Sequence, residues 1–217
     1  MVMNRRCVVV GELVDARSVD DRDALRNSLD EGIARANEAL REHLVAPFTV
    51  LRGVGEIGGV LTDPEKSARA LRELAEAVLP VEIRFAVVYG EIDVGLATEA
   101  VSRMDGPAFH EADRRLDALA ANDKAVAFVD PDVEPWIRTL LADQLGLLLT
   151  MKQGWTAYQA ELVRAYRREG SMQAIADRRD VSVQTVSQTL ARANAREILA
   201  VESNLDSALS AVWGWSP

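Results

Sequence analysis

The segment from Ser171 to Asn194 constrains the fold of this chain more than any other stretch. It begins with a serine, a residue type that caps helix N-termini, and continues with apolar residues at helical spacing: Met172, Ile175 and Ala176. Asp180 breaks this spacing, and Val181 is expected to pack the turn against the core. Ser182 is a second N-cap in front of another amphipathic stretch. The segment therefore predicts two short helices joined by a tight turn.

The second of these helices is expected to begin at Val183 and to bury Val186, Leu190 and Ala193. The remaining side chains, together with the N-cap, form a polar outer face: Ser182, Gln184, Thr185, Ser187, Gln188 and Arg192. Glutamine can pair with adenine through two hydrogen bonds, serine and threonine with a base edge or phosphate, and arginine with guanine or phosphate. The pattern predicts a DNA-binding helix-turn-helix at 171–194. A helical hairpin with a merely solvated polar face is the alternative.

The charge distribution agrees with duplex DNA as a partner of the C-terminal part only. The net charge is −9, yet residues 1–150 carry 17 Lys and Arg against 27 Asp and Glu, and residues 151–217 carry 8 against 7. Within 164–196 there are seven arginines and three acids. Nucleic acid would meet this region and be repelled by the rest. Five arginines are expected to flank the recognition helix and contact phosphates, with a merely solvated face as the alternative: Arg164, Arg167, Arg168, Arg178 and Arg179. Arg168 and Arg178 are the principal candidates, and replacing Arg168 should weaken binding to all DNA sequences alike.

Before residue 130, apolar runs alternate with amphipathic stretches. Predicted strands lie at 6–14, 48–52, 60–61, 81–89 and 125–129. Predicted helices lie at 20–44, 64–79 and 106–119. The order β-α-β-β-α-β, followed by α-β, predicts an α+β fold of the ferredoxin-like, palm-like kind, with a helix layer on one antiparallel sheet.

The stretch Asp130-Pro-Asp-Val-Glu-Pro135 interrupts the chain, and the part beyond it is predicted to be all-α. Helices are expected at 136–151, at 155–169, in the helix-turn-helix, and in an extension of its last helix to about residue 209. We predict two domains, a palm-like one at 1–133 and a helical one at 134–217, with 153–154 as the alternative boundary.

Two features of the helical part bear on its packing. The leucines of 136–151 cover more than one face of the helix, so we expect it to be packed on both sides, as a connector or a dimerisation helix. Trp136 and Trp155 are expected to anchor helix packing. Trp213 and Trp215 are expected to dock on the chain's own core or on a second subunit.

Several short motifs, in this order and spacing, resemble the SatD family. They are Gly11-Glu-Leu-Val-Asp-Ala-Arg17, Pro47-Phe-Thr-Val50, Ile83-Arg-Phe85 with Tyr89-Gly-Glu91, and Asp105-Gly-Pro-Ala-Phe-His110. The resemblance covers nearly the whole chain, and the helix-turn-helix lies where that family has one. The N-terminal domain is also distantly similar to the palm of class III nucleotide cyclases and diguanylate cyclases.

The cyclase resemblance implies one metal-binding aspartate at the end of the first strand and another on the hairpin. Here Glu12 and Gly55 stand at those places, within Val54-Gly-Glu-Ile57 for the hairpin. Candidate metal or ligand residues are Glu12, Asp15, Glu56, Glu91 and His110. Gly55 replaces one acid, and Glu12 is longer than the expected aspartate by a methylene, so we expect a catalytically degenerate domain without a cofactor. Mg²⁺ is expected only if the site is intact.

Taken together, the residues predict a sequence-specific DNA-binding protein, a transcriptional regulator whose N-terminal domain dimerises or senses a ligand, with a small nucleotide as a candidate. One recognition helix reads few base pairs, so a homodimer on double-stranded DNA is expected. The alternatives are a Mg²⁺-dependent nucleotidyl transferase or cyclase-like enzyme with an appended DNA-binding domain, and a protein-interaction adaptor. The apolar stretch Leu140–Met151 is too short to span a bilayer, and we expect a cytoplasmic protein without a membrane partner.

Overall fold

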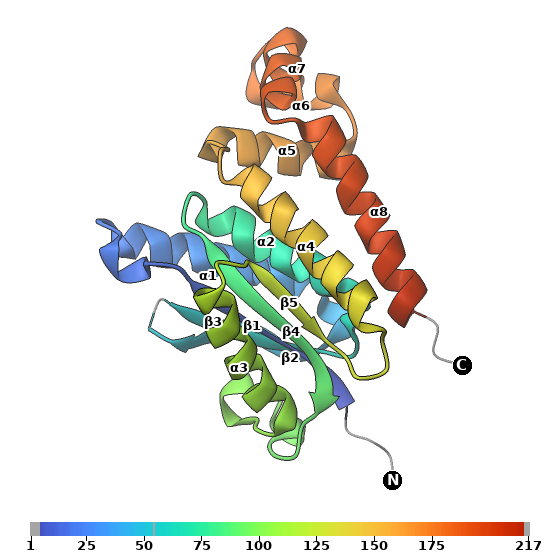
Figure 1. Cartoon of the computed structure of the whole chain (residues 1–217). Helices are drawn as coiled ribbons and strands as arrows, with labels where there is room; N and C mark the ends of the chain where they lie inside the picture. Colours follow the sequence, from blue (N-terminus) through green and yellow to red (C-terminus); the bar gives the residue numbers. More distant parts are fainter. Residues whose placement is uncertain (1–4, 54, 215–217) are drawn as a thin grey trace.

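The computed structural model describes residues 5–53 and 55–214. It is an α+β fold in which these residues form a mixed five-stranded sheet and eight α-helices (Figure 1). The strands are β1 (Arg5–Leu13), β2 (Leu44–Arg52), β3 (Glu56–Leu61), β4 (Ile83–Glu91) and β5 (Val126–Val129). Their order across the sheet is β2-β3-β1-β4-β5, with β1 at the centre.

The sheet is buried on both faces. Successive residues of a strand point to opposite faces, and all four residues of Cys7–Val10 are buried. Cys7 and Val9 join the larger core, on the side of α1 (Arg22–Ala39) and α2 (Ser67–Val78). Val8 and Val10 join a second core formed with α3 (Pro107–Ala121) on the opposite side.

The expectation of a wholly antiparallel sheet with helices on one face is therefore wrong. β5 pairs in parallel with β4, while the other neighbours are antiparallel. Two consecutive parallel strands need a crossover connection, and α3 provides it across the second face of the sheet. Apolar residues spaced three or four positions apart on α3 close that face: Ala108, Ala112, Leu116 and Leu119.

The C-terminal part is helical, with α4 (Pro135–Lys152), α5 (Ala157–Glu169), α6 (Met172–Arg179), α7 (Val183–Arg192) and α8 (Ala195–Trp213). The larger core runs without interruption from the sheet into these helices. The predicted boundary at 133 falls in the turn between β5 and α4; the division into two domains remains a prediction.

The end of the chain differs from the sequence-based expectation. The last helix is not an extension of α7, because Asn194 adopts a left-handed φ of 50° and α8 starts anew behind it. α8 runs back along α2 and α4 to the sheet (Figure 1). Trp213 stacks on Phe128 at 5.8 Å between ring centroids and donates to Asp130 Oδ2 at 2.7 Å, so it docks on the chain's own core. Trp215 lies outside the described residues.

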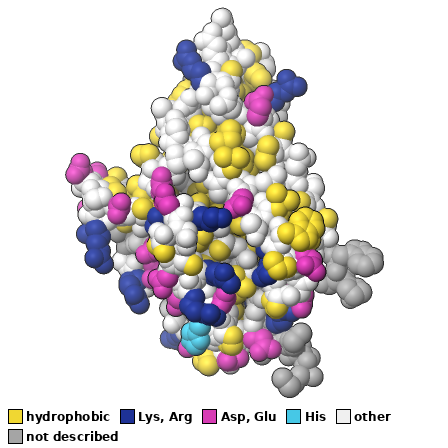
Figure 2. Space-filling model, viewed as in Figure 1, with side chains coloured by type: hydrophobic (Ala, Val, Ile, Leu, Met, Phe, Trp, Pro, Cys, Tyr) yellow, Lys and Arg dark blue, Asp and Glu magenta, His cyan; other side chains and the backbone are white. Residues whose placement is uncertain are grey.

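Helix α4 is packed on one side only, contrary to the expectation of burial on both. Leu141, Leu145, Leu148 and Leu149 face the core, whereas Leu140 and Leu147 are 52% and 62% exposed. Trp136 is also exposed and does not anchor packing, while Trp155 is buried as expected. Figure 2 shows hydrophobic side chains gathered on the face of the molecule where α4 lies. No helix in the described part of the chain has the length and apolarity that crossing a bilayer requires.

Candidate functional site

The turn between α6 and α7 is built by the residues that the sequence singles out. Ser171 and Ser182 each accept a hydrogen bond from the backbone N–H three residues further on, so both N-caps are confirmed. Asp180 adopts a left-handed φ of 52° and ends α6, and the N–H of Val181 donates to the carbonyl of Ala176 at 3.1 Å. These bonds define the path of the chain from α6 into α7.

The inner side of α6 and α7 is anchored in the larger core. Ile175 of α6 and Val186 and Leu190 of α7 are buried. The indole N–H of Trp155 donates to the carbonyl of Ala193 at 3.0 Å, which ties the end of α7 to the start of α5. The orientation of α7 is thus set by packing at its middle and by a hydrogen bond at its end.

The outer side of α7 is polar and accessible. All six predicted contact residues of this helix and its cap are exposed: Ser182, Gln184, Thr185, Ser187, Gln188 and Arg192. Gln184, Gln188 and Arg192 recur every four residues and form one stripe along the helix. The hydroxyls of Ser182 and Thr185 lie 2.8 Å apart and belong to the cap. The two glutamines and Arg192 therefore present the donors and acceptors that a partner would meet.

The two predicted phosphate contacts, Arg168 and Arg178, lie beside one another on α5 and α6. Both pair with Glu169, Arg168 at 2.8 Å, and the side chain of Glu169 is only 12% exposed. Sequence reasoning had not assigned a role to this carboxylate. It holds the two guanidinium groups together and neutralises part of their charge.

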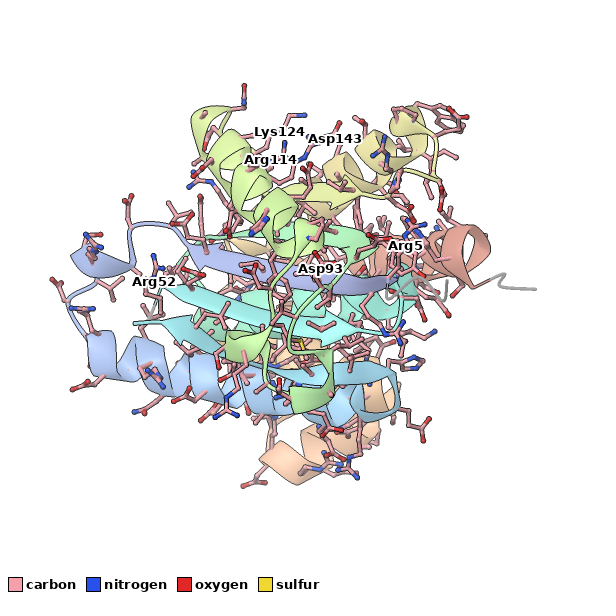
Figure 3. The ribbon with its side chains drawn as sticks, turned by 90° about the horizontal axis from the view of Figure 1, so that it is seen from below. Arg5, Arg52, Asp93, Arg114, Lys124 and Asp143 are labelled. Carbon is pink, nitrogen blue, oxygen red and sulfur yellow. The ribbon has the colours of Figure 1, made fainter. Side chains whose placement is uncertain are left out.

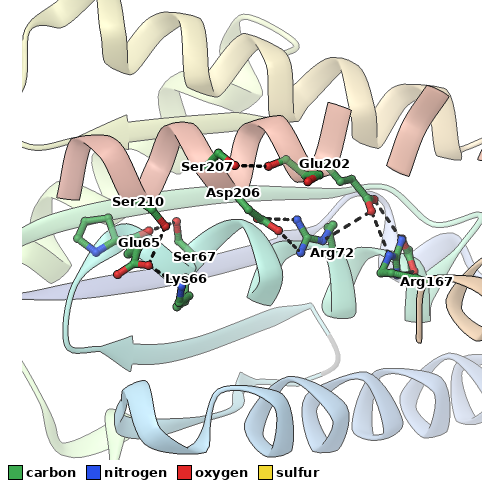
Figure 4. A network of polar contacts seen from close by, with 12 residues as sticks. Glu65, Lys66, Ser67, Arg72, Arg167, Glu202, Asp206, Ser207 and Ser210 are labelled. Atoms are coloured by element: carbon green, nitrogen blue, oxygen red, sulfur yellow. Dashed lines mark hydrogen bonds and ion pairs between the residues drawn. The ribbon is translucent and has the colours of Figure 1, made fainter. Parts of the chain in front are cut away.

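Behind α5 lies a buried ionic cluster that the sequence did not reveal. Lys152 of α4 is 1% exposed, and its ammonium lies 2.7 Å from Glu76 of α2 and also pairs with Glu202 of α8. Arg167 of α5 pairs with the same two carboxylates, at 2.7 Å and 3.0 Å. Arg72 binds Asp206 at 2.8 Å beside them (Figure 4). Four helices from both parts of the chain thus meet at one cluster. Arg167, which the sequence offered as a phosphate contact, is used here instead.

The buried cluster predicts a specific loss of stability in acid. Burial alone would raise the pKa of Glu76, but Lys152 and Arg167 lower it from 4.5 to about 2. A carboxylate with a depressed folded-state pKa stabilises the fold above pH 4.5, and this contribution is lost as the pH falls towards 2. We expect Glu76 to account for about 3 kcal/mol of that loss.

Urea unfolding at several pH values between 7 and 2 measures this effect. The free energy of unfolding should fall more steeply below pH 4.5 in the wild type than in Glu76→Gln, whose side chain does not titrate. Parallel pH profiles for the two proteins would contradict the assignment of the low pKa to Glu76.

A second group of polar residues lies at one end of the sheet, where the metal candidates of the first strand and hairpin were expected. Glu12 of β1 stands opposite Glu56 of β3, and the neighbouring strands place Arg52 opposite Glu56 and Arg84 opposite Glu12. Across β2, β3, β1 and β4 the row reads Arg, Glu, Glu, Arg. Two carboxylates directly opposite one another repel, and an arginine on each side offsets that repulsion.

This end of the sheet also contains a pocket of about 550 Å³, here called the sheet-end pocket. Glu12, Asp15 and Glu56 line it together with an equal number of arginines: Arg17, Arg22 and Arg52. The structure thus gathers three of the five candidate ligand residues. Within residues 5–53 and 55–214, no three His, Cys, Asp or Glu side chains are placed to hold a metal ion. This balanced set of charges does not fit a pair of metal ions, which requires clustered carboxylates.

The other two candidates lie elsewhere. Glu91 of β4 is the strand partner of Arg5 on β1. Arg5 lies seven residues from Glu12 along β1, so Glu91 and Glu12 are about 23 Å apart. Figure 3 shows Arg52 and Arg5 towards opposite ends of the sheet. His110 is exposed on α3, with its Nε2 3.1 Å from Asp105. Neither residue contributes to the sheet-end pocket.

Comparison with known proteins gives one family and a distant structural likeness. Residues 7–198 match the SatD family. No match is found among curated proteins. Two solved structures of a bacterial light-regulated adenylyl cyclase are similar over 58% of this chain and 43% of theirs. They share 15% and 13% identity with it, at TM-scores of 0.40 and 0.41. The chain spans less than half the length of those proteins.

Proposed function

The chain belongs to the SatD family, and we propose that it is a sequence-specific DNA-binding protein, a transcriptional regulator that reads duplex DNA with α7. The observation that carries this proposal is the exposed stripe Gln184–Gln188–Arg192 on a helix whose opposite side is anchored in the core. The stripe is about 12 Å long, which corresponds to roughly three or four base pairs of B-DNA. In this proposal α6 and α7 form a helix-turn-helix and α7 enters the major groove.

The sheet part is proposed to be a palm-like domain of the ferredoxin-like type. The order β2-β3-β1-β4, with α1 and α2 packed on one face, supports this. In this proposal β5 and α3 are additions to the β-α-β-β-α-β unit formed by β1 to β4 with α1 and α2. The domain supports α7 rather than performing catalysis.

The proposal predicts that the two glutamines of the stripe determine base preference. Gln184→Ala or Gln188→Ala should each weaken binding to the preferred sequence by about 1–3 kcal/mol, because a bidentate contact to a base edge is lost. Selection of duplexes from a random pool, followed by affinity measurements, checks the effect. Gln173→Ala is the matched control, since Gln173 is exposed on α6 and lies outside the stripe.

Two outcomes would contradict the proposal. If both α7 variants select the same sequences as the wild type, α7 does not read bases. If no duplex is bound even at low salt, the α6–α7 unit contacts protein, as the adaptor alternative requires.

We propose that the protein binds DNA as a homodimer, with α4 as the contact between subunits. Its exposed apolar residues are Trp136, Leu140, Leu147 and Met151. An antiparallel copy of α4 centred between Asp143 and Gln144 would place Trp136 against Met151 and Leu140 against Leu147, in both directions. Such self-complementarity is what a two-fold contact requires. Asp143 would lie near the two-fold axis of this contact. Lys124 pairs with it at 3.2 Å and offsets the charge of its carboxylate (Figure 3).

An enzymatic function at the sheet-end pocket is the second candidate, because its volume and its three arginines suit a phosphate-bearing ligand. A nucleotidyl transferase of this kind would need Mg²⁺ and a nucleoside triphosphate bound near Glu12 and Glu56, and the balanced charges of the pocket do not favour the metal ions. Calorimetry with Mg-ATP and Mg-GTP separates the candidates. Absence of heat, together with nanomolar binding of a selected duplex, supports the regulator; turnover of either triphosphate supports the enzyme.

A further inference from the structure

A second polar cavity lies between the sheet part and the helical part of the molecule. It has a volume of about 510 Å³ and is here called the arginine pocket. One wall comes from the helices that cover the sheet, α1 and α2: Arg35, Arg69 and Arg72. The other wall comes from α5 and α6: Arg164, Arg167, Arg168 and Arg179. Pockets of this volume accommodate small ligands.

The arginine pocket is strongly cationic in a protein whose net charge is −9. Seven arginines line it against three carboxylates, Glu73, Glu161 and Asp206. Glu76, Glu202 and Glu169, which lie outside the lining, pair with Arg167 and Arg168, so the uncompensated positive charge is that of Arg69 and Arg164. The sheet-end pocket is the internal comparison, because its three arginines face three carboxylates. A concentrated positive charge inside a concave surface attracts anions.

Part of this charge is not used inside the protein. Arg72 is paired with Asp206 through two hydrogen bonds, at 2.8 Å and 3.0 Å. By contrast, among the described residues neither Arg69 nor Arg164 forms an ion pair with a carboxylate. Arg164 is half-buried and donates one hydrogen bond, 3.2 Å long, to the carbonyl of Glu76. A guanidinium has five N–H donors, so most of those of Arg164 remain available.

The electrostatics of Arg164 agree with a missing anion. Burial lowers the pKa of its guanidinium, and the neighbouring Arg35 and Arg167 lower it further, against the opposing effect of Glu76 and Glu73. The charged form of this side chain is therefore held at a cost. An anion between Arg164, Arg35 and Arg69 would relieve the repulsion and occupy the unused donors.

The lining also indicates what kind of anion fits. Ala165 is the single apolar residue among the residues that line the pocket, and none of them is aromatic. A nucleobase needs an apolar or aromatic wall to stack on, and the pocket offers none. None of the exposed residues of α7 lines it either. The chemistry suits a compact, highly charged ligand rather than a base-bearing one.

We propose that the arginine pocket binds a small compact polyanion with two or more phosphate groups. The phosphates would bridge Arg35 and Arg69 on the sheet side and Arg164 on the helical side. Occupancy would thus join the two parts of the molecule next to the buried cluster of Glu76, Lys152 and Glu202. This inference stands independently of DNA binding, and it concerns a different pocket from the one that the enzymatic alternative needs.

Titration calorimetry of the full chain with inorganic pyrophosphate tests the proposal. We expect a single site with a dissociation constant of about 100 µM or lower at low salt. Arg69→Ser and Arg164→Gln should each weaken it about tenfold or more, through the loss of charge-assisted hydrogen bonds. Arg103→Ser is the matched control, because it removes an exposed arginine that lines neither pocket and should leave pyrophosphate binding unchanged. Arg52→Ser reports any binding at the sheet-end pocket instead. Circular dichroism confirms that each variant is folded.

The remaining outcomes overturn the proposal. These are absence of binding, equal binding by all variants, loss of binding in Arg52→Ser alone, and binding of ATP without binding of pyrophosphate. If Arg69→Ser weakens the binding of duplex DNA of every sequence while the wild type does not bind pyrophosphate, the pocket binds the DNA backbone instead.

Discussion

Replacing Lys152 by methionine is expected to destabilise the protein by about 3–5 kcal/mol. The ammonium of Lys152 lies between Glu76 and Glu202, whose side chains are 0% and 4% exposed. Without it, Arg167 alone remains to balance two buried carboxylates, apart from Arg72 at 4.0 Å from Glu202. A buried charge that loses its partner keeps the cost of desolvation, which is why the effect is large.

Chemical unfolding of Lys152→Met at neutral pH measures this loss. Arg41→Met is the matched control, because the pair of Arg41 with Glu38 is exposed and should contribute at most about 1 kcal/mol. Adding Glu76→Gln to Lys152→Met removes one of the two uncompensated carboxylates and should recover part of the stability. A loss of under about 1 kcal/mol for Lys152→Met would show that the cluster is hydrated or rearranged rather than buried.

Replacing Leu147 by glutamate is expected to convert the proposed dimer into a monomer. In the antiparallel α4 contact, each subunit places Leu147 against Leu140 of its partner, so one substitution affects the interface twice. Burial of a leucine side chain contributes about 2 kcal/mol, and two copies therefore correspond to a dissociation constant about a thousandfold higher. Binding to a two-fold symmetric duplex should weaken strongly, and binding to a single half-site should not.

Sedimentation velocity over a range of concentrations checks the change in mass. Val94→Glu is the control, because Val94 is 58% exposed and lies in the connection between β4 and α3, away from α4. A wild type that stays monomeric at high concentration would refute this interface, and so would a Leu147→Glu protein that stays dimeric.

The elements that the sequence predicted well are those whose ends and faces are encoded by neighbouring residues. Both serine caps, the turn at Asp180 and the polar face of α7 follow from spacings of three or four residues. The strands of the sheet follow from short apolar runs such as Cys7–Val10. The parallel pairing of β5 was missed because pairing direction depends on the path of the connecting helix and leaves no pattern within the strand.

For the candidate sites, the sequence placed the outer residues of α7 and the acids of the first strand and hairpin. It could not separate Glu91 from Glu12, since both belong to strand ends but to opposite ends of the sheet. It also treated Arg167 as one of a group of equivalent surface arginines. The half-buried position of Arg167 is set by Glu76, which is 91 residues away in the chain.

Local chemistry by itself therefore determined that this chain carries a capped two-helix unit with a polar outer face behind a strand-rich part, because caps and periodicity act within one or two helical turns. Only the tertiary structure decided which face of α4 stays exposed, which charges are buried together, and where arginines from distant helices converge on one pocket. These outcomes depend on which surfaces meet when the helices pack on the sheet. The desolvation that makes a buried charge cost free energy arises only where those surfaces come into contact.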